Sequence, residues 1–140
     1  MKPRPVLSLF VVLVVVTAGA LALAVSPAGS LTILAQDGAA PSPELVERGE
    51  QVALDFGCLT CHTTTGARLI GPSFLGLYGS EVRLNDGSTA FADETFIRGE
   101  IVAGHERTVL DYPAGIMPDY GGLIPGEDVD ALVAWIVSLG

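Results

Sequence analysis

The chain has 140 residues, with 17 glycines, 9 prolines and only 6% aromatic residues, so it has room for one loop-rich domain and some additional chain. A small domain with few large side chains usually needs a staple, a metal or a cofactor to complete its core. The formal net charge is −9 and the single lysine is Lys2. A domain this acidic does not bind nucleic acid by counterion release, so we expect no nucleic-acid partner.

The N-terminal segment is strongly apolar from residue 6 to residue 25 and follows two basic residues, Lys2 and Arg4. Such a run is long enough to cross a ~30 Å hydrocarbon core as a helix. The positive flank places the N-terminus in the cytoplasm and the rest of the chain outside. We expect residues 1–25 to be a signal anchor, a transmembrane helix in the bacterial cytoplasmic membrane. A cleaved signal peptide is the alternative, because the sequence ALA at 22–24 resembles a cleavage site.

The next segment, residues 26–42, is rich in small residues and contains proline and glycine, which predicts a linker. It would tether a domain close to the membrane. No internal repeat is visible, so residues 43–140 are expected to form one domain on the periplasmic or extracellular side of the membrane.

Helical spacing of apolar residues predicts three helices, at about 43–56, 94–102 and 125–140. Ser42 and Pro43 are typical of a helix N-cap and first helical position, and Gly57 ends the first helix. Asp93 caps the second helix. No alternating pattern predicts a sheet, and residues 63–92 are expected to be mostly loop. We therefore expect an all-α domain whose first and last helices pack together.

Both cysteines and one of the two histidines of the chain lie within five positions, as Cys58, Cys61 and His62. The pattern C-x-x-C-H is typical of c-type haem attachment. Each sulfur adds to one haem vinyl group and becomes a thioether, and positions i and i+3 near a helix turn bring the two sulfurs close together. His62 then lies under the ring and offers a nitrogen to the iron. We expect one covalently bound haem c.

Three other interpretations of the cysteine motif have less support. A thioredoxin-like redox pair needs a βαβ context, which the pattern does not predict. A structural zinc site usually needs a second pair of ligands, and the sequence has no second cysteine pair and no His-x₃₋₅-His. A disulfide between Cys58 and Cys61 would close a very small loop and add little stability.

Met117 is the candidate for the second axial ligand. Haem iron in electron carriers is commonly bound by His and Met, and the Met raises the reduction potential. The only other methionine is Met1, and the Gly- and Pro-rich surroundings of Met117 make it a poor core filler. His105 is the competitor, and bis-His ligation would lower the potential. Its polar neighbours indicate a solvent-exposed side chain.

Four further residues are candidates for the cofactor site. The carbonyl of Pro72 would accept the proton of the second His62 nitrogen and fix the orientation of the ring, although a simple turn proline is the alternative. Arg83, Arg98 and the hydroxyl of Tyr112 are candidates to hold the haem propionates. Each of these three is equally compatible with a solvated surface role.

Taken together, these motifs resemble those of class I (monohaem) cytochromes c over nearly all of residues 43–140. The resemblance is carried by C-x-x-C-H, then GP, then MP, then a terminal helix that bears Trp135. The sequence is similar to the cytochrome c domain fused to subunit II of some haem–copper oxidases and to domains in other respiratory complexes. The resemblance implies that the N- and C-terminal helices pack around the haem and cross at Gly49.

The sequence also departs from that family. No copper-binding domain precedes the haem domain in these 140 residues, so we do not expect an oxidase subunit II. Ala53 stands where the family often has an aromatic residue, and residues 103–111 depart from the usual pattern. The lysines with which mitochondrial-type carriers dock are missing.

These features predict a membrane-tethered c-type cytochrome that transfers single electrons in a respiratory or photosynthetic chain. It would not be an enzyme by itself, but a subunit of, or a tethered shuttle to, a larger membrane redox complex or another redox protein. One alternative is a soluble periplasmic carrier after signal cleavage. Others are a haem-based enzyme or gas sensor with an open sixth site, and a haem subunit that only stabilises an assembly.

Overall fold

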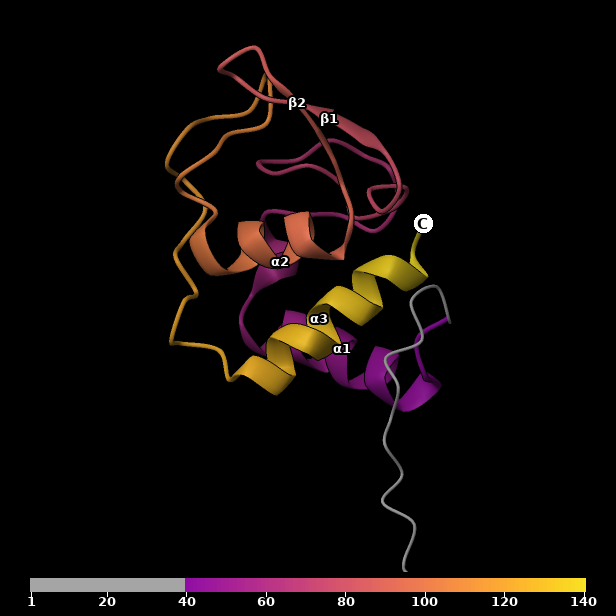
Figure 1. Cartoon of the computed structure of the whole chain (residues 1–140). Helices are drawn as coiled ribbons and strands as arrows, with labels where there is room; N and C mark the ends of the chain where they lie inside the picture. The colour runs from indigo at the N-terminus through magenta and orange to yellow at the C-terminus, as the bar shows by residue number, and fades with distance from the viewer. Residues whose placement is uncertain (1–39) are drawn as a thin grey trace, which may run out of the picture. The chain divides into compact units, whose positions relative to one another are not determined.

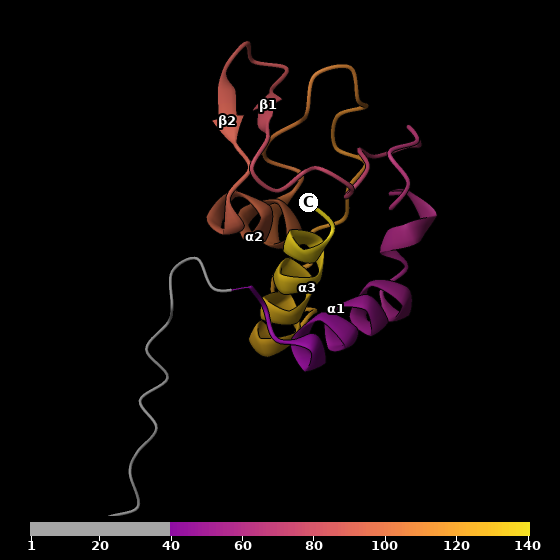
Figure 2. The ribbon, with the colours of Figure 1, turned by 90° about the vertical axis from the view of Figure 1, so that its right-hand side faces the viewer.

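The computed structural model describes residues 40–140, so the predicted transmembrane helix and most of the predicted linker lie outside the described residues. The described elements, in chain order, are α1 (Pro43–Asp55), the 3-10 turn η1 (Cys58–Thr60), β1 (Glu81–Arg83), β2 (Thr89–Phe91), α2 (Glu94–Ala103) and α3 (Gly126–Ser138) (Figure 1). A second view shows α3 between α2 and α1 (Figure 2). None of the helices within 40–140 has the length and hydropathy of a membrane span.

Local capping explains where the first two helices begin, and both predicted caps are confirmed. The Ser42 hydroxyl accepts a hydrogen bond from the Leu45 N–H at 3.3 Å. The Asp93 carboxylate accepts one from the Phe96 N–H at 2.7 Å. At the end of α1, Gly57 has a left-handed φ of 71°, which favours glycine and turns the chain into η1.

The crossing of α1 and α3 depends on Gly49, as the family resemblance implied. A Cβ atom at this position would overlap the carbonyl oxygen of Ala131 and lie 2.6 Å from the Cβ of Trp135. Only glycine therefore lets the two helices approach this closely. Ala53, one turn further along α1, is completely buried.

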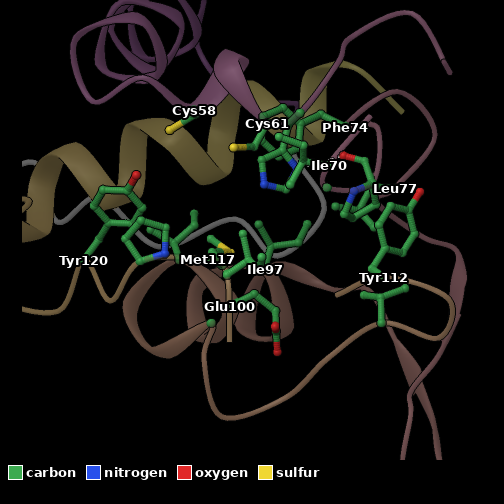
Figure 3. A pocket seen from close by; sticks show the side chains of 18 of the residues that line it. Cys58, Cys61, Ile70, Phe74, Leu77, Ile97, Glu100, Tyr112, Met117 and Tyr120 are labelled. Atoms are coloured by element: carbon green, nitrogen blue, oxygen red, sulfur yellow. Dashed lines mark hydrogen bonds between the residues drawn. The ribbon is translucent and has the colours of Figure 1, made fainter. Parts of the chain in front are cut away.

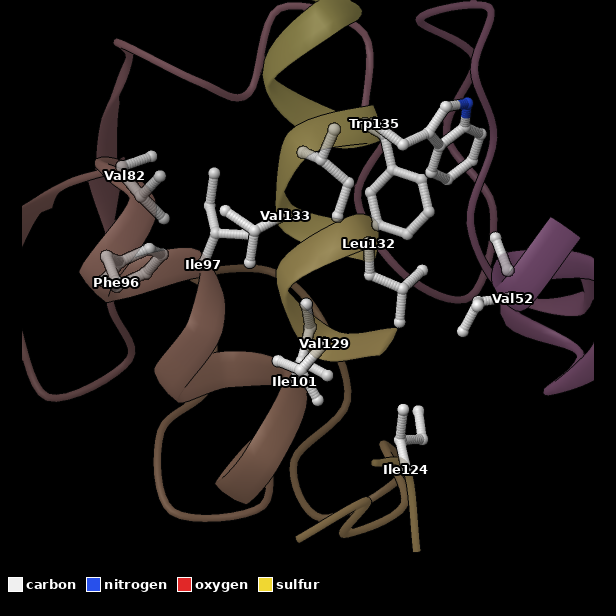
Figure 4. Packing of buried hydrophobic residues seen from close by; sticks show 14 of the residues in the cluster. Val52, Val82, Phe96, Ile97, Ile101, Ile124, Val129, Leu132, Val133 and Trp135 are labelled. Carbon is white, nitrogen blue, oxygen red and sulfur yellow. The ribbon is translucent and has the colours of Figure 1, made fainter. Parts of the chain in front are cut away.

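The hydrophobic core lies around α3, which packs against α1 on one side and α2 on the other (Figure 4). Its buried members come from α1, β1, α2 and α3 and include Val52, Val82, Phe96, Ile97, Ile101, Val129, Leu132, Val133 and Trp135. In α2 the buried residues are Phe96, Ile97 and Ile101. The fold thus joins three helices through one core that also supports the site described below.

A small antiparallel sheet corrects the prediction that residues 63–92 are mostly loop and that the domain has no strands. In it, β1 pairs with β2, and Val82 lies opposite Ala90. The chain turns at Gly87, with φ of 87°, and the Asp86 carboxylate accepts hydrogen bonds from the N–H and the hydroxyl of Ser88. Each strand has only three residues, too few for a period-2 pattern to be visible in the sequence.

The irregular segment between α2 and α3 is attached to this hairpin. Leu84 forms a β-bridge with Val109, and the Leu110 N–H donates to the carbonyl of Arg83 at 2.8 Å. The Asn85 N–H donates to the carbonyl of Thr108 at 2.9 Å. The hairpin therefore fixes the first half of the chain that leads to Met117.

Candidate functional site

A cavity of about 470 Å³, lined mainly by apolar side chains, lies between the loop after α1, the helix α2, residues 104–118 and the inner face of α3. This volume falls within the ~300–1,000 Å³ typical of cofactor and ligand sites. Cys58, Cys61, His62 and Met117 all line it. Figure 3 shows the two cysteines on one wall and Met117, with Ile97, on the opposite wall.

We call residues 57–74 the cysteine wall. Its turn η1 is closed by the carbonyl of Cys58, which accepts hydrogen bonds from the N–H groups of Cys61 at 3.2 Å and His62 at 3.0 Å. Both cysteines are free thiols. Burial raises the pKa of Cys58, and the neighbouring Cys61 raises it further. Thioredoxin-like cysteines have lowered pKa values, so this environment disfavours a thiol-exchange role.

His62 is held by its neighbours on the same wall. Its Nδ1 lies 2.7 Å from the carbonyl oxygen of Pro72, which confirms the predicted hydrogen bond. When Nδ1–H donates to this carbonyl, Nε2 is left with a free lone pair. Burial lowers the pKa of His62, and the bond to Pro72 partly opposes this shift. The ring is therefore held neutral, which is the form that binds a metal.

Two residues that orient His62 were missed by the sequence analysis. Phe74 stacks on the imidazole, with ring centroids 4.6 Å apart and planes 11° apart. Phe74 also makes an edge-on contact with the ring of Trp135 in α3. A Cβ at Gly71 would lie 2.5 Å from Cε1 of His62. The only sequence signal was that both residues lie within two positions of Pro72, in the stretch GPSF.

We call α2 and residues 104–118 the methionine wall. The Sδ of Met117 packs against Gly104, where a Cβ would lie 2.6 Å from the sulfur. His105, the competing ligand, does not line the cavity. Its side chain is 49% exposed, and Nδ1 lies 3.8 Å from Oδ2 of Asp119. Of the two histidines in the chain, only His62 therefore faces the same cavity as Met117.

The three propionate candidates have different locations. Tyr112 lines the cavity. Arg83 instead lines a smaller neighbouring cavity of about 220 Å³, which shares Pro72 and part of its wall with the first. Arg98 is not in either cavity and pairs with Asp130 of α3.

The location of Arg98 follows from helix geometry. It comes directly after Ile97, which points inward, and one residue turns an α-helix by about 100°. The guanidinium is therefore turned toward solvent and Asp130. The sequence prediction that placed Arg98 near a haem is not supported by this arrangement.

A charged pair in the methionine wall was also missed by the sequence analysis. Nη2 of Arg107 lies 2.7 Å from Oε1 of Glu100, although this oxygen receives no well-directed hydrogen bond. The Arg107 guanidinium also lies 4.9 Å from the ring centroid of Phe96. Burial raises the pKa of Glu100, and the charge of Arg107 opposes this shift. The helix ends between the two residues, so no helical spacing predicted their contact.

The arrangement fits a covalently bound haem in its chemistry. It offers two thiols on one wall, one oriented imidazole nitrogen, one thioether sulfur on the opposite wall, and apolar surfaces between them. Within residues 40–140, no group of three or more His, Cys, Asp or Glu side chains is placed to hold a metal ion. Comparison of the chain with protein-family models and with curated proteins found no match.

Proposed function

We propose that this protein is a c-type cytochrome that transfers single electrons and carries one haem bound covalently through Cys58 and Cys61. The supporting observation is that a single apolar cavity gathers the C-x-x-C-H motif on one wall and the sulfur of Met117 on the other. Haem iron that cycles between Fe(II) and Fe(III) supplies the one-electron chemistry.

In this proposal the chain contributes ligands, orientation and exclusion of water. His62 binds through Nε2, and its ring is oriented by the carbonyl of Pro72. Met117 binds from the opposite wall and raises the reduction potential. The apolar cavity walls keep water from the site and thereby also influence the potential.

The propionate groups would lie at the edge of the cavity near Tyr112. The Tyr112 hydroxyl and the Arg107 guanidinium are the candidate donors that line the main cavity. Arg83 remains a candidate through the smaller cavity that adjoins it. Arg98 is dropped from this role because its guanidinium pairs with Asp130 on the outer surface.

We also propose that residues 1–25 anchor the protein in the bacterial cytoplasmic membrane, with the haem domain on the periplasmic side. The support is the uninterrupted apolar run after Lys2 and Arg4. The partner would then be a membrane redox complex or another redox protein. Intact mass of the protein purified from membranes tests this proposal, since a mature N-terminus after residue 24 would leave a soluble periplasmic carrier.

The central experiment is acid–acetone extraction of the full-length protein, produced in a host that attaches c-type haem. Haem should stay with the polypeptide of the wild-type protein and of the control His105→Ala. The double variant Cys58→Ala/Cys61→Ala should retain none, because both thioether sulfurs are gone. Extraction of haem into the organic phase from wild-type protein would contradict the proposed function.

A further inference from the structure

Arg68 joins the two loops that carry His62 and Met117. It lies in the loop after His62, and its guanidinium stacks over the ring of Tyr112, 4.4 Å from the centroid. The same guanidinium donates a hydrogen bond to the backbone carbonyl of Asp111. Tyr112 lines the cavity and begins the stretch that leads to Met117.

The loop that carries Arg68 is held by hydrogen bonds within itself. The Ser73 hydroxyl accepts a hydrogen bond from the Gly66 N–H at 3.0 Å and donates one to the carbonyl of Thr63 at 3.0 Å. The Thr63 hydroxyl donates to the carbonyl of Ala67 at 2.6 Å. These bonds fold the loop onto itself, so Arg68 projects from a fixed base.

The segment that carries Met117, residues 113–118, is held by hydrogen bonds on either side of it. The Tyr112 N–H donates to the carbonyl of Val109 at 3.1 Å, and the Gly121 N–H donates to the carbonyl of Val102 at 3.0 Å. Between them, residues 113–118 make no hydrogen bond to any part of the described chain. The position of Met117 therefore depends on how well Tyr112 and Gly121 are fixed.

The backbone at Asp111 gives independent support. Asp111, with φ of 69°, is the only non-glycine residue among residues 40–140 with a positive φ. This conformation is uncommon and costs free energy, even for aspartate, which tolerates it better than most residues. The hydrogen bond from Arg68 to the Asp111 carbonyl stabilises the strained turn immediately before Tyr112.

We propose that Arg68 is a positioning residue for Met117: by holding Asp111 and Tyr112, it keeps residues 113–117 closed over the cavity and the Met117 sulfur in place. This role rests on the proposed function, because Met117 needs a haem iron to bind. Without Arg68, the segment opens more often, and an added ligand competes more successfully for the position of Met117.

The test is a titration of the oxidised, haem-loaded, full-length protein with imidazole, followed by visible absorbance. Arg68→Gln should bind imidazole about five- to tenfold more tightly, since it loses both a cation–π contact and a charge-assisted hydrogen bond. Arg68→Lys keeps the charge but not the planar group, so it should recover less than half of the difference.

Arg48→Gln is the matched control. It also removes an exposed arginine, whose contact with Asp128 at 2.6 Å joins α1 to α3 and touches neither ligand loop. Its imidazole affinity should stay within about twofold of wild type, because its partner Asp128 belongs to α3 and lies outside both ligand loops. An equal increase in both variants would overturn the role of Arg68.

Hydrogen exchange supplies a readout that does not depend on ligand binding. In Arg68→Gln, the amides of Leu110 and Tyr112 should exchange faster than in wild type, while those of α1 and α3 should not change. Unchanged imidazole affinity and unchanged exchange in haem-loaded Arg68→Gln would overturn this inference and leave the proposed function intact. Loss of haem from the wild-type protein on acid–acetone extraction would instead refute the proposed function itself.

Discussion

The cysteine wall is closed by hydrogen bonds within its own stretch of chain, whereas the methionine wall, residues 94–118, is attached by hydrogen bonds to parts of the chain outside it. In the cysteine wall, the Gly71 N–H donates to the carbonyl of Cys61 at 2.7 Å, and the Phe74 N–H donates to that of Thr63 at 2.8 Å. These short-range bonds close the loop around His62. In the methionine wall, Met117 is held by packing against Gly104 and by the attachments at the ends of its loop.

This difference assigns separate tasks to the two walls. The cysteine wall presents its thiols and imidazole through local hydrogen bonds, so under the proposed function it would determine whether a haem is bound at all. The methionine wall depends on contacts with the rest of the domain, so under the proposed function it would adjust the sixth ligand and the reduction potential without controlling attachment. Substitutions in the two walls should consequently have different effects.

The largest effect is expected for Gly71→Ala in the cysteine wall. The new Cβ would lie 2.5 Å from Cε1 of His62, whose ring is also stacked on Phe74. Overpacking of this kind costs about 1–3 kcal/mol. We expect a lower yield of haem-loaded protein and a lower thermal unfolding midpoint. The control Gly126→Ala places its Cβ in open space and should match wild type in both measurements.

Met117→Ala should have the next largest effect, but a different one. Haem should remain covalently attached, while the reduction potential falls on the order of 100 mV, within the ~0.8 V range that axial ligands span. The reduced variant should also bind carbon monoxide, which the wild-type protein should bind poorly. Redox titration and visible spectra measure both changes. If His105→Ala reproduces these changes and Met117→Ala does not, then His105 is the ligand.

Gly104→Ala should produce a smaller change of the same kind. Its Cβ would lie 2.6 Å from Sδ of Met117 and would also overlap the carbonyl oxygen of Glu100. The sulfur must therefore shift, which weakens its bond to iron and lowers the potential by less than Met117→Ala does. Acid–acetone extraction should show full haem retention. Loss of haem here, as expected for Gly71→Ala, would contradict the separation of tasks between the walls.

The smallest effect concerns the pH dependence of stability at Glu100. Burial raises the pKa of this carboxyl group in the folded protein, so the folded state binds more protons than the unfolded state above about pH 4.3. Stability is therefore lost as the pH rises through the folded-state pKa. Glu100→Gln should unfold at a higher urea concentration than wild type at pH 7 and at nearly the same concentration at pH 4. An equal difference at both pH values would show that ionisation of Glu100 is not the cause.

Local sequence determined the helices and most of the candidate ligands. Ser42, Asp93 and Gly57 act within a few residues of themselves, so the helix ends that they set were predictable from composition and spacing. The cysteine motif is equally local. Met117 was predictable for a different reason, because the chain offers only one methionine besides Met1.

Tertiary structure alone decided which charged and aromatic side chains reach the cavity. Arg107 lines it because the end of α2 and the turn after it redirect the chain, whereas Arg98 lies on another face of α2 and pairs with Asp130. The hairpin of β1 and β2 escaped prediction because three-residue strands are stabilised by their partner and by the bridge to Val109, not by a pattern of their own. The contact of Arg68 with Tyr112 likewise joins residues that are far apart in sequence. Such pairings depend on how the whole chain packs, and neither residue carries a local signal of the other.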